Sequence, residues 1–226
     1  MLPLALFVCC STALQHSQGN VKKMQTKEKE DCENLSNLNS QITMTESTES
    51  MVRNINVCRS VVIEIMNKTR NVVLQDFRSY CFSGRVNSPL PFEIGPGSRG
   101  KCAFAKTPYS LRGSVGVLVC KLNSSVLAIM FSNPFDYVLY HIEFALEIFT
   151  ADNHLGSLHN VYSNMMRNKT YSTSTLFQRG NADSEHETLE VSKGTIRVRA
   201  KMSNNEKAVM KVQIEDIDPP PYQKNA

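Results

Sequence analysis

Two apolar runs near the middle of the chain form its clearest pattern. Residues 114–120 and 126–131 are almost wholly apolar, and a short Asn-Ser-Ser turn joins them. Runs of this length, rich in Val and Leu and bounded by turn residues, are typical of buried β-strands. Pro134 has no backbone N–H to donate to a strand ladder, so the second strand is expected to end near Ser132.

Other segments also show strand patterns, while one shows a helical pattern. Leu158, Val161, Tyr162 and Met165 have the spacing of a short amphipathic helix over residues 157–166. Pro and Gly recur at short intervals over residues 89–100, which predicts a loop. The further strands are predicted in residues 61–66, 71–83 (as strand, turn, strand), 142–149, 189–201 and 208–214. Many strands and few helices indicate an all-β sandwich or barrel.

The ends of the chain are predicted to lie outside this β domain, which spans residues 58–216. Residues 1–19 have the apolar length of a signal peptide, although no Lys or Arg precedes the apolar part. Residues 20–57 are polar, with the charge run KEKED and sparse apolar positions, and are predicted to be flexible. Residues 217–226 are Pro-rich and are expected to form a disordered tail.

Composition narrows the function classes. With 226 residues, 41% hydrophobic and 20% charged, the chain is long enough to fold around one sizeable core. A net charge of +4 is too small for a nucleic-acid-binding surface. Five cysteines follow residue 19, an odd number with no zinc-type spacing, and Cys120 in its apolar strand is expected to be a buried free thiol.

The sequence contains no catalytic or metal-binding constellation. Its five histidines are scattered, and no nucleophile elbow, P-loop or pair of carboxylates is found. The segment GPGSRG at residues 95–100 fits the dinucleotide-binding spacing, but Pro96 removes a backbone donor and KCAFAKT follows instead of a helix. We therefore expect neither an enzyme nor a bound cofactor or metal.

A loop rich in aromatic rings follows Pro134. Phe135, Tyr137 and Tyr140 lie within six residues of one another. Tyrosine combines an apolar ring with a polar hydroxyl, which suits a membrane interface or a pocket for a cation. Ordinary packing in the core and turn is the alternative interpretation of the same residues.

The segment GSVGVLVC…VLAIMFSNPFDYVLY resembles the signature of the actinoporin family of pore-forming cytolysins and their vertebrate relatives. A weaker resemblance extends over residues 58–216. It implies a compact β-sandwich flanked by one or two short α-helices. It also implies a protein that binds phosphocholine lipids such as sphingomyelin, with homo-oligomeric, cation-permeable pores and cytolysis as a further activity.

The resemblance also implies a binding site. By motif position, the phosphocholine-binding residues that it implies are Ser83, Val115, Ser132, Pro134 and Tyr140. Tyr137 of the same loop and Tyr162 of the predicted short helix are expected to add rings to this site. Phe135 and Leu139 are expected to contact the membrane.

Some features depart from the cytolytic members of that family. The chain has no Trp, Glu143 places a charge near the loop, and Arg179-Gly180-Asn181 lacks the carboxylate of the family's Arg-Gly-Asp. The polar residues 20–57 are a poor candidate for a membrane-crossing helix. A non-lytic, lectin-like or adaptor sandwich that binds a glycan or a protein is therefore the alternative function.

Localisation depends on where translation begins. With residues 1–19 as a signal peptide, the protein is expected to be secreted and to act at a target cell membrane. The sequence MTESTES at Met44 resembles the start of vertebrate relatives, and a start there predicts a cytosolic protein. In the cytosol, the Pro-Pro-x-Tyr pattern between Pro219 and Tyr222 would suit a WW-domain partner.

Overall fold

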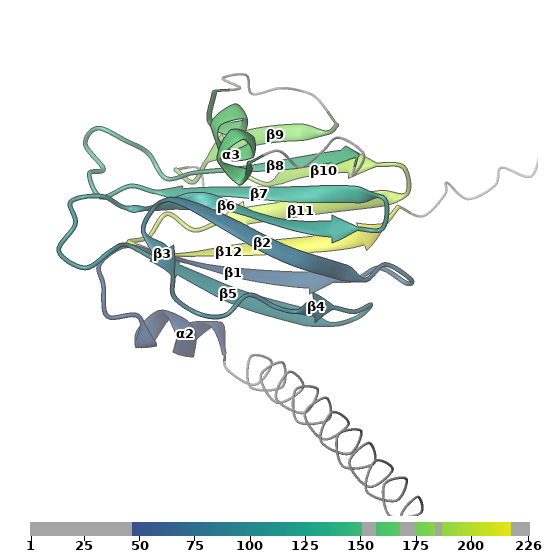
Figure 1. Cartoon of the computed structure of the whole chain (residues 1–226), viewed down its shortest axis with the longest axis horizontal. Coiled ribbons are helices and arrows are strands. Elements are labelled where there is room, and N and C mark those ends of the chain that lie inside the picture. The colour runs from purple at the N-terminus through teal and green to yellow at the C-terminus, as the bar shows by residue number, and fades with distance from the viewer. Residues whose placement is uncertain (1–46, 151–156, 168–174, 184–186, 218–226) are drawn as a thin grey trace, which may run out of the picture. The chain divides into compact units, whose positions relative to one another are not determined.

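The computed structural model in Figure 1 describes residues 47–150, 157–167, 175–183 and 187–217. Over these residues the chain forms two sheets of six strands each, with two short α-helices. The predicted signal peptide, residues 218–226 of the predicted tail with its Pro-Pro-x-Tyr pattern, and most of the predicted flexible segment lie outside the described residues. The predicted fold class, a β-sandwich with one or two short helices, is confirmed.

The first sheet has the strand order β10-β11-β12-β1-β5-β3. Its neighbours pair in antiparallel fashion except for β1 and β12, which are parallel. Its strands are β10 at Leu189–Lys193, β11 at Ile196–Met202, β12 at Lys207–Asp216, β1 at Ser60–Asn67, β5 at Arg99–Ala105 and β3 at Arg85–Val86.

The second sheet has the order β4-β2-β6-β7-β8-β9 and is antiparallel throughout its described pairs. Its strands are β4 at Glu93–Ile94, β2 at Leu74–Ser83, β6 at Ser114–Leu122, β7 at Ser125–Asn133, β8 at Glu143–Thr150 and β9 at Phe177–Asn181. β6 and β7 are the two buried strands that the sequence predicted, and they occupy the middle of this sheet. β7 ends immediately before Pro134.

The main core lies between the two sheets. Phe104 of β5 and Phe131 of β7 are fully buried there, with ring centroids 4.4 Å apart. The helix α3 (Leu158–Arg167) adds a second apolar layer by placing Tyr162 and Met165 on the outer face of β6 and β7. These two strands are therefore covered on both faces, which explains why their sequences are continuously apolar rather than alternating.

The helix α2 (Thr48–Asn54) covers the outer face of the first sheet. Its residue Met51 and the following Ile55 pack against Val62 of β1 and Ala103 of β5. The Ser47 hydroxyl caps the helix by accepting a hydrogen bond from the Ser50 amide. Residues 48–54, which belong to the segment predicted to be flexible, thus form a helix, because packing on the sheet stabilises a helix too short to form alone.

Three other predictions of secondary structure need correction. Residues 71–83 were expected to form two strands, but they contain the single strand β2, whose register shifts between Gln75 and Arg78. Asp76 in that irregularity has a φ of 55°. The predicted loop at residues 89–100 contains the two-residue strand β4 and the start of β5. The short strands β3 and β9 and residues 101–105 of β5 were not predicted.

The four cysteines in the described residues are all free thiols. Cys102 and Cys120 are fully buried, and burial raises the pKa of Cys120 to about 12. The prediction of a buried free thiol at Cys120 is therefore confirmed. Neither of the helices in the described part of the chain is long and apolar enough to span a bilayer.

Candidate functional site

The register of the second sheet places three predicted site residues next to one another. Ser83 of β2 lies opposite Val115 of β6, and Val115 lies opposite Ser132 of β7. Directly opposed residues project from the same face of a sheet. Val115 packs in the layer beneath α3, so this row lies on the outer face, where that helix leaves part of the sheet uncovered.

The row borders a cleft of about 600 Å³. The cleft contains every predicted site residue except Tyr137, including the two residues that were predicted to contact a membrane. Its lining residues are Phe82, Ser83, Leu111, Arg112, Gly113, Val115, Ser132, Pro134, Phe135, Asp136, Leu139, Tyr140, His141, Glu143, Tyr162 and Met166.

Aromatic rings from β2 and α3 form one side of this cleft. The ring of Tyr162 is stacked on that of Phe82, with centroids 5.3 Å apart and an interplanar angle of 19°. Tyr80 lies 6.0 Å from Tyr162, and its hydroxyl is hydrogen bonded to Nδ1 of His159 over 2.9 Å. Burial raises the pKa of Tyr162 to about 12, so its hydroxyl stays protonated at neutral pH.

The loop after β7 forms the opposite rim. The Asp136 side chain accepts hydrogen bonds from the amides of Val138, at 2.8 Å, and Leu139, at 3.3 Å. The Tyr140 amide donates to the Asp136 carbonyl oxygen over 3.2 Å. This Asx-type turn points the side chains at the tip of the loop toward solvent. Val138 is 93% exposed and Leu139 is 69% exposed.

Arg59, just before β1, holds the start of this loop. Its Nε donates to the Pro134 carbonyl oxygen over 3.0 Å, and its Nη2 donates to the Phe135 carbonyl oxygen over 2.9 Å. Nη1 forms an ion pair of 2.8 Å with Glu206. The guanidinium is nearly buried, so these charge-assisted hydrogen bonds are protected from competing water.

Tyr137 contributes to this support instead of lining the cleft. Its ring lies beneath the Arg59 guanidinium, 4.3 Å from Cζ, and its hydroxyl donates to Oδ1 of Asn133 over 2.8 Å. Burial raises its pKa above the usual value. Arg59 thus covers one face of this ring, and Tyr137 does not line the cleft, so its contact with a headgroup stays a prediction.

The cleft also contains polar groups able to bind an anion. The Ser83 hydroxyl donates to the Gly113 carbonyl oxygen over 2.8 Å, so its proton is already used. Ser132 has no side-chain hydrogen bond to any described residue, and Arg112 forms no ion pair with one. Sequence reasoning missed Phe82 and Arg112, although they directly precede Ser83 and the Gly113 that begins the signature segment.

Glu143 and His141 line the cleft and contact the side chains of Arg179 and Asp183. Oε2 of Glu143 lies 2.6 Å from Nη2 of Arg179, whose other terminal nitrogen donates to the Met166 carbonyl oxygen at the end of α3. Asp183 lies 2.7 Å from Nδ1 of His141. The unfavourable charge expected at Glu143 is thus neutralised by a residue of the Arg-Gly-Asn sequence.

No group of His, Cys, Asp or Glu side chains in the described ranges is arranged to hold a metal ion. The arrangement suits a small ligand with a cationic part and an anionic part. Rings of Phe82, Tyr140 and Tyr162 can contact the cation, while Ser132 and Arg112 can donate hydrogen bonds to the anion.

The sequence and the fold are similar to those of known proteins. The profile of the family described as "Sea anemone cytotoxic protein" matches residues 41–216. Hydra actinoporin-like toxin 3 from Hydra vulgaris is 28% identical over 107 residues, which cover 47% of this chain and 67% of the toxin. DELTA-alicitoxin-Pse1b from Phyllodiscus semoni is 30% identical over 141 residues, which cover 61% of this chain and 57% of the toxin.

Among solved structures, the lipid binding protein Nakanori has a similar fold. Its TM-score with this chain is 0.59, and the alignment covers 85% of this chain and 84% of Nakanori. The sequence identity is 12%, so this likeness concerns the arrangement of the strands alone.

Proposed function

The chain belongs to the sea anemone cytotoxic protein family, a family of non-enzymatic toxins, and on this premise we propose that it binds membranes by recognising phosphocholine lipids. The cleft beside α3 is the proposed headgroup site. The observation that carries the proposal is the joint lining of this cleft by the rings of Phe82, Tyr140 and Tyr162 and by the donor groups of Ser132 and Arg112.

The two halves of phosphocholine match the two kinds of lining residue. An aromatic face attracts a quaternary ammonium by about 0.5–2 kcal/mol, depending on how well the pair is shielded from water. The guanidinium of Arg112 and the hydroxyl of Ser132 would bind the phosphate through charge-assisted and neutral hydrogen bonds. In this proposal Ser83 and Val115 shape the floor of the cleft, and Pro134 shapes its wall.

Exposed apolar side chains around the cleft would enter the lipid interface. Leu111 is 80% exposed and Leu139 69% exposed, and both line the cleft. Tyr140 is 62% exposed at its rim. Transfer of these side chains from water into the headgroup region is favourable by the hydrophobic effect, and tyrosine prefers that interface. Phe135 is partly covered by Arg59 and Lys106, so we propose a smaller lipid contact for it.

Vesicle flotation tests the headgroup site. We expect binding to vesicles of sphingomyelin or phosphatidylcholine and much weaker binding to phosphatidylethanolamine vesicles, whose ammonium lacks the methyl groups. Ser132→Ala combined with Tyr140→Ala should weaken choline-dependent binding about 10- to 30-fold, because the variant loses contacts worth about 2 kcal/mol. Phe92→Ala, which removes an exposed ring outside the cleft, should bind like the wild type.

Equal binding to choline and ethanolamine vesicles would contradict the proposal. Retained vesicle binding by the double variant would favour the alternative function, in which the sandwich binds a glycan or a protein.

Oligomeric pore formation is proposed as a separate and weaker activity. Binding without strong leakage is expected, because the polar composition of residues 20–57 is unsuited to a helix that crosses a bilayer. Dye release from sphingomyelin vesicles, measured beside flotation, separates the two steps. Secretion, followed by action at a target membrane, is the localisation that we propose.

A further inference from the structure

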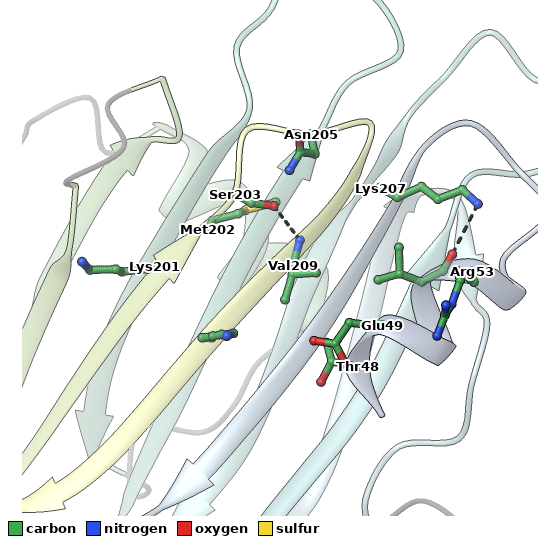
Figure 2. A pocket seen from close by; sticks show the side chains of 11 residues that line it. Thr48, Glu49, Arg53, Lys201, Met202, Ser203, Asn205, Lys207 and Val209 are labelled. Carbon is green, nitrogen blue, oxygen red and sulfur yellow. Dashed lines mark hydrogen bonds between the residues drawn. The ribbon is translucent and has the colours of Figure 1, made fainter. Parts of the chain in front are cut away.

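A second cleft lies on the outer face of the other sheet. It has a volume of about 660 Å³ and lies between α2 and strands β11 and β12 (Figure 2). Its lining residues are Thr48, Glu49, Val52, Arg53, Lys201, Met202, Ser203, Asn205, Lys207, Val209 and Lys211. Four of these side chains are cationic and one is a carboxylate, so the cleft is strongly positive although the whole chain carries only +4.

Two of the lysines face each other across neighbouring strands. Lys201 of β11 and Lys211 of β12 are register partners, so their Cα atoms are about 4.5–5.5 Å apart. Both side chains are exposed on the same face. Like charges in directly opposed positions destabilise a sheet unless an opposite charge lies between them.

Neighbouring charges on this face are balanced, in contrast to this pair. Arg199 forms ion pairs of 2.7 Å with Glu190 and 3.0 Å with Glu215. Glu64, the other register partner of Lys211, forms an ion pair of 3.8 Å with Arg99 and accepts a hydrogen bond from Thr48 over 3.1 Å. Among the described residues, no carboxylate lies within ion-pair distance of Lys201 or Lys211. The unbalanced positive charge is therefore concentrated at the centre of the face.

The side of the cleft formed by α2 is also positively charged. Lys207 reaches the Val52 carbonyl oxygen over 3.3 Å, as the dashed line in Figure 2 shows. The pKa of Glu49 lies below its usual value, first through hydrogen bonds with its own amide and with Ser47, and further through the charges of Lys211 and Lys101. The single carboxylate that lines the cleft thus stays ionised and leaves a net positive charge.

We propose that this cleft binds a ligand that carries phosphate monoester groups. A phosphate with a charge close to −2 would lie between Lys201 and Lys211 and relieve their mutual repulsion. Arg53 and Lys207 would bind a second phosphate nearer to α2. This site is separate from the choline cleft, and its ligand differs by the absence of a cation.

The position of the cleft suits a ligand at a membrane. Its lining residue Asn205 accepts, through its carbonyl oxygen, a 3.3 Å hydrogen bond from Nδ2 of Asn133, which ends β7. Pro134, the next residue, lines the choline cleft. Both clefts therefore reach the same end of the sandwich, on opposite outer faces. The phosphates could belong to a lipid headgroup or to a soluble inositol phosphate, and the experiment distinguishes these sources.

The test compares the full chain with Lys201→Gln combined with Lys211→Gln, in two arms. The first arm measures flotation with phosphatidylethanolamine vesicles, with and without a phosphatidylinositol bisphosphate. The second arm measures binding of soluble inositol trisphosphate by calorimetry. Because neither arm contains choline, failure of the choline proposal would leave this result interpretable. Lys68→Gln with Lys121→Gln is the control, since it removes the same charge at the far end of the strands: Lys68 directly follows β1, and Lys121, which pairs with Asp76, lies near the end of β6.

Wild-type protein and the control should bind the phosphorylated ligand in at least one arm, and the Lys201 and Lys211 variant should bind about tenfold more weakly or not at all. Binding in the vesicle arm alone would show that the ligand is a lipid headgroup in a membrane. Binding in the calorimetric arm would show that a soluble inositol phosphate is sufficient to occupy the cleft. The variant should also melt no lower than the wild type, because it loses a like-charge pair. Absence of binding in both arms, or equal loss in the control, would overturn the proposal.

Discussion

At the scale of single residues, Arg59 shows how a buried cation can shape a site that it does not line. It binds two carbonyl groups at the start of the loop after β7, and its guanidinium covers the ring of Tyr137. Both carbonyls belong to residues more than seventy positions away in the sequence. The rim of the cleft is therefore positioned by a side chain from the opposite sheet.

Replacing Arg59 tests this role. Arg59→Met should lower the free energy of unfolding by about 3 kcal/mol, because it leaves two carbonyls without their charged donor. Arg59→Lys keeps the charge but cannot donate to both carbonyls in the same geometry, so we expect about half that loss. Urea denaturation measures the stability, and amide hydrogen exchange at Val138 and Tyr140 measures the order of the loop.

Arg85→Met, at an exposed arginine of β3, is the matched control and should change neither quantity. If exchange in the loop were the same in Arg59→Met as in the wild type, Arg59 would not position the rim.

The residue scale also shows what the sequence could predict. Ser83, Val115 and Ser132 were found from motif position, and the sheet register explains why they meet. Tyr137 was assigned with the other rings, since its type and spacing fit a ligand contact equally well. Its contacts with Arg59 and Asn133 arise from tertiary packing, and no local pattern indicates which ring of a loop will face an internal cation.

At the scale of elements, Gly116 determines how closely β2 approaches β6. A Cβ at this position would clash with the Tyr80 carbonyl oxygen and would lie 3.1 Å from the ring of Phe131. The glycine therefore lets the strand that carries Tyr80 and Phe82 pack directly against the centre of the sheet. This is the physical reason for the second glycine of the signature segment.

Gly116→Ala should destabilise the protein by about 2 kcal/mol, because the added methyl group forces two paired backbones apart. The displacement should also separate the rings of Tyr80 and Phe82 from Tyr162 and weaken choline-dependent vesicle binding. Gly95→Ala is the control, since its Cβ would meet only Oγ of Ser98 at 4.0 Å and should leave stability unchanged. Equal stability of the two variants in urea denaturation would show that β2 is not held at this contact.

Prediction of the elements succeeded where burial imposed a regular pattern. The central strands β6 and β7 and the helix α3 follow directly from their apolar spacing. The prediction failed for α2 and β9, each of which has few apolar residues and depends on a neighbour for its stability. Met51 and Ile55 appear as isolated apolar positions in a polar segment, and only the apolar patch around Val62 and Ala103 gives them a partner.

At the scale of the whole molecule, the exposed apolar side chains of the cleft lie at one end of the sandwich. The loop after β7 follows Asn133, which pairs with Ser114 at the start of β6. Phe92, which is 77% exposed, lies near β4, where Leu74 pairs with both Ile94 and Leu122 at the other end of these strands. A probe placed at each end can therefore report how the molecule is oriented on a membrane.

The absence of tryptophan from the chain makes this orientation measurable. Leu139→Trp places a single indole at the rim of the choline cleft, and Phe92→Trp places one at the far end. If the cleft end enters the lipid interface, sphingomyelin vesicles should shift the emission of Leu139→Trp to shorter wavelength and protect it from aqueous quenchers, because its indole leaves water. Phe92→Trp should show neither change while binding equally well in flotation. A shift in Phe92→Trp without one in Leu139→Trp would require the molecule to bind by its opposite end, and would remove the headgroup role from the cleft.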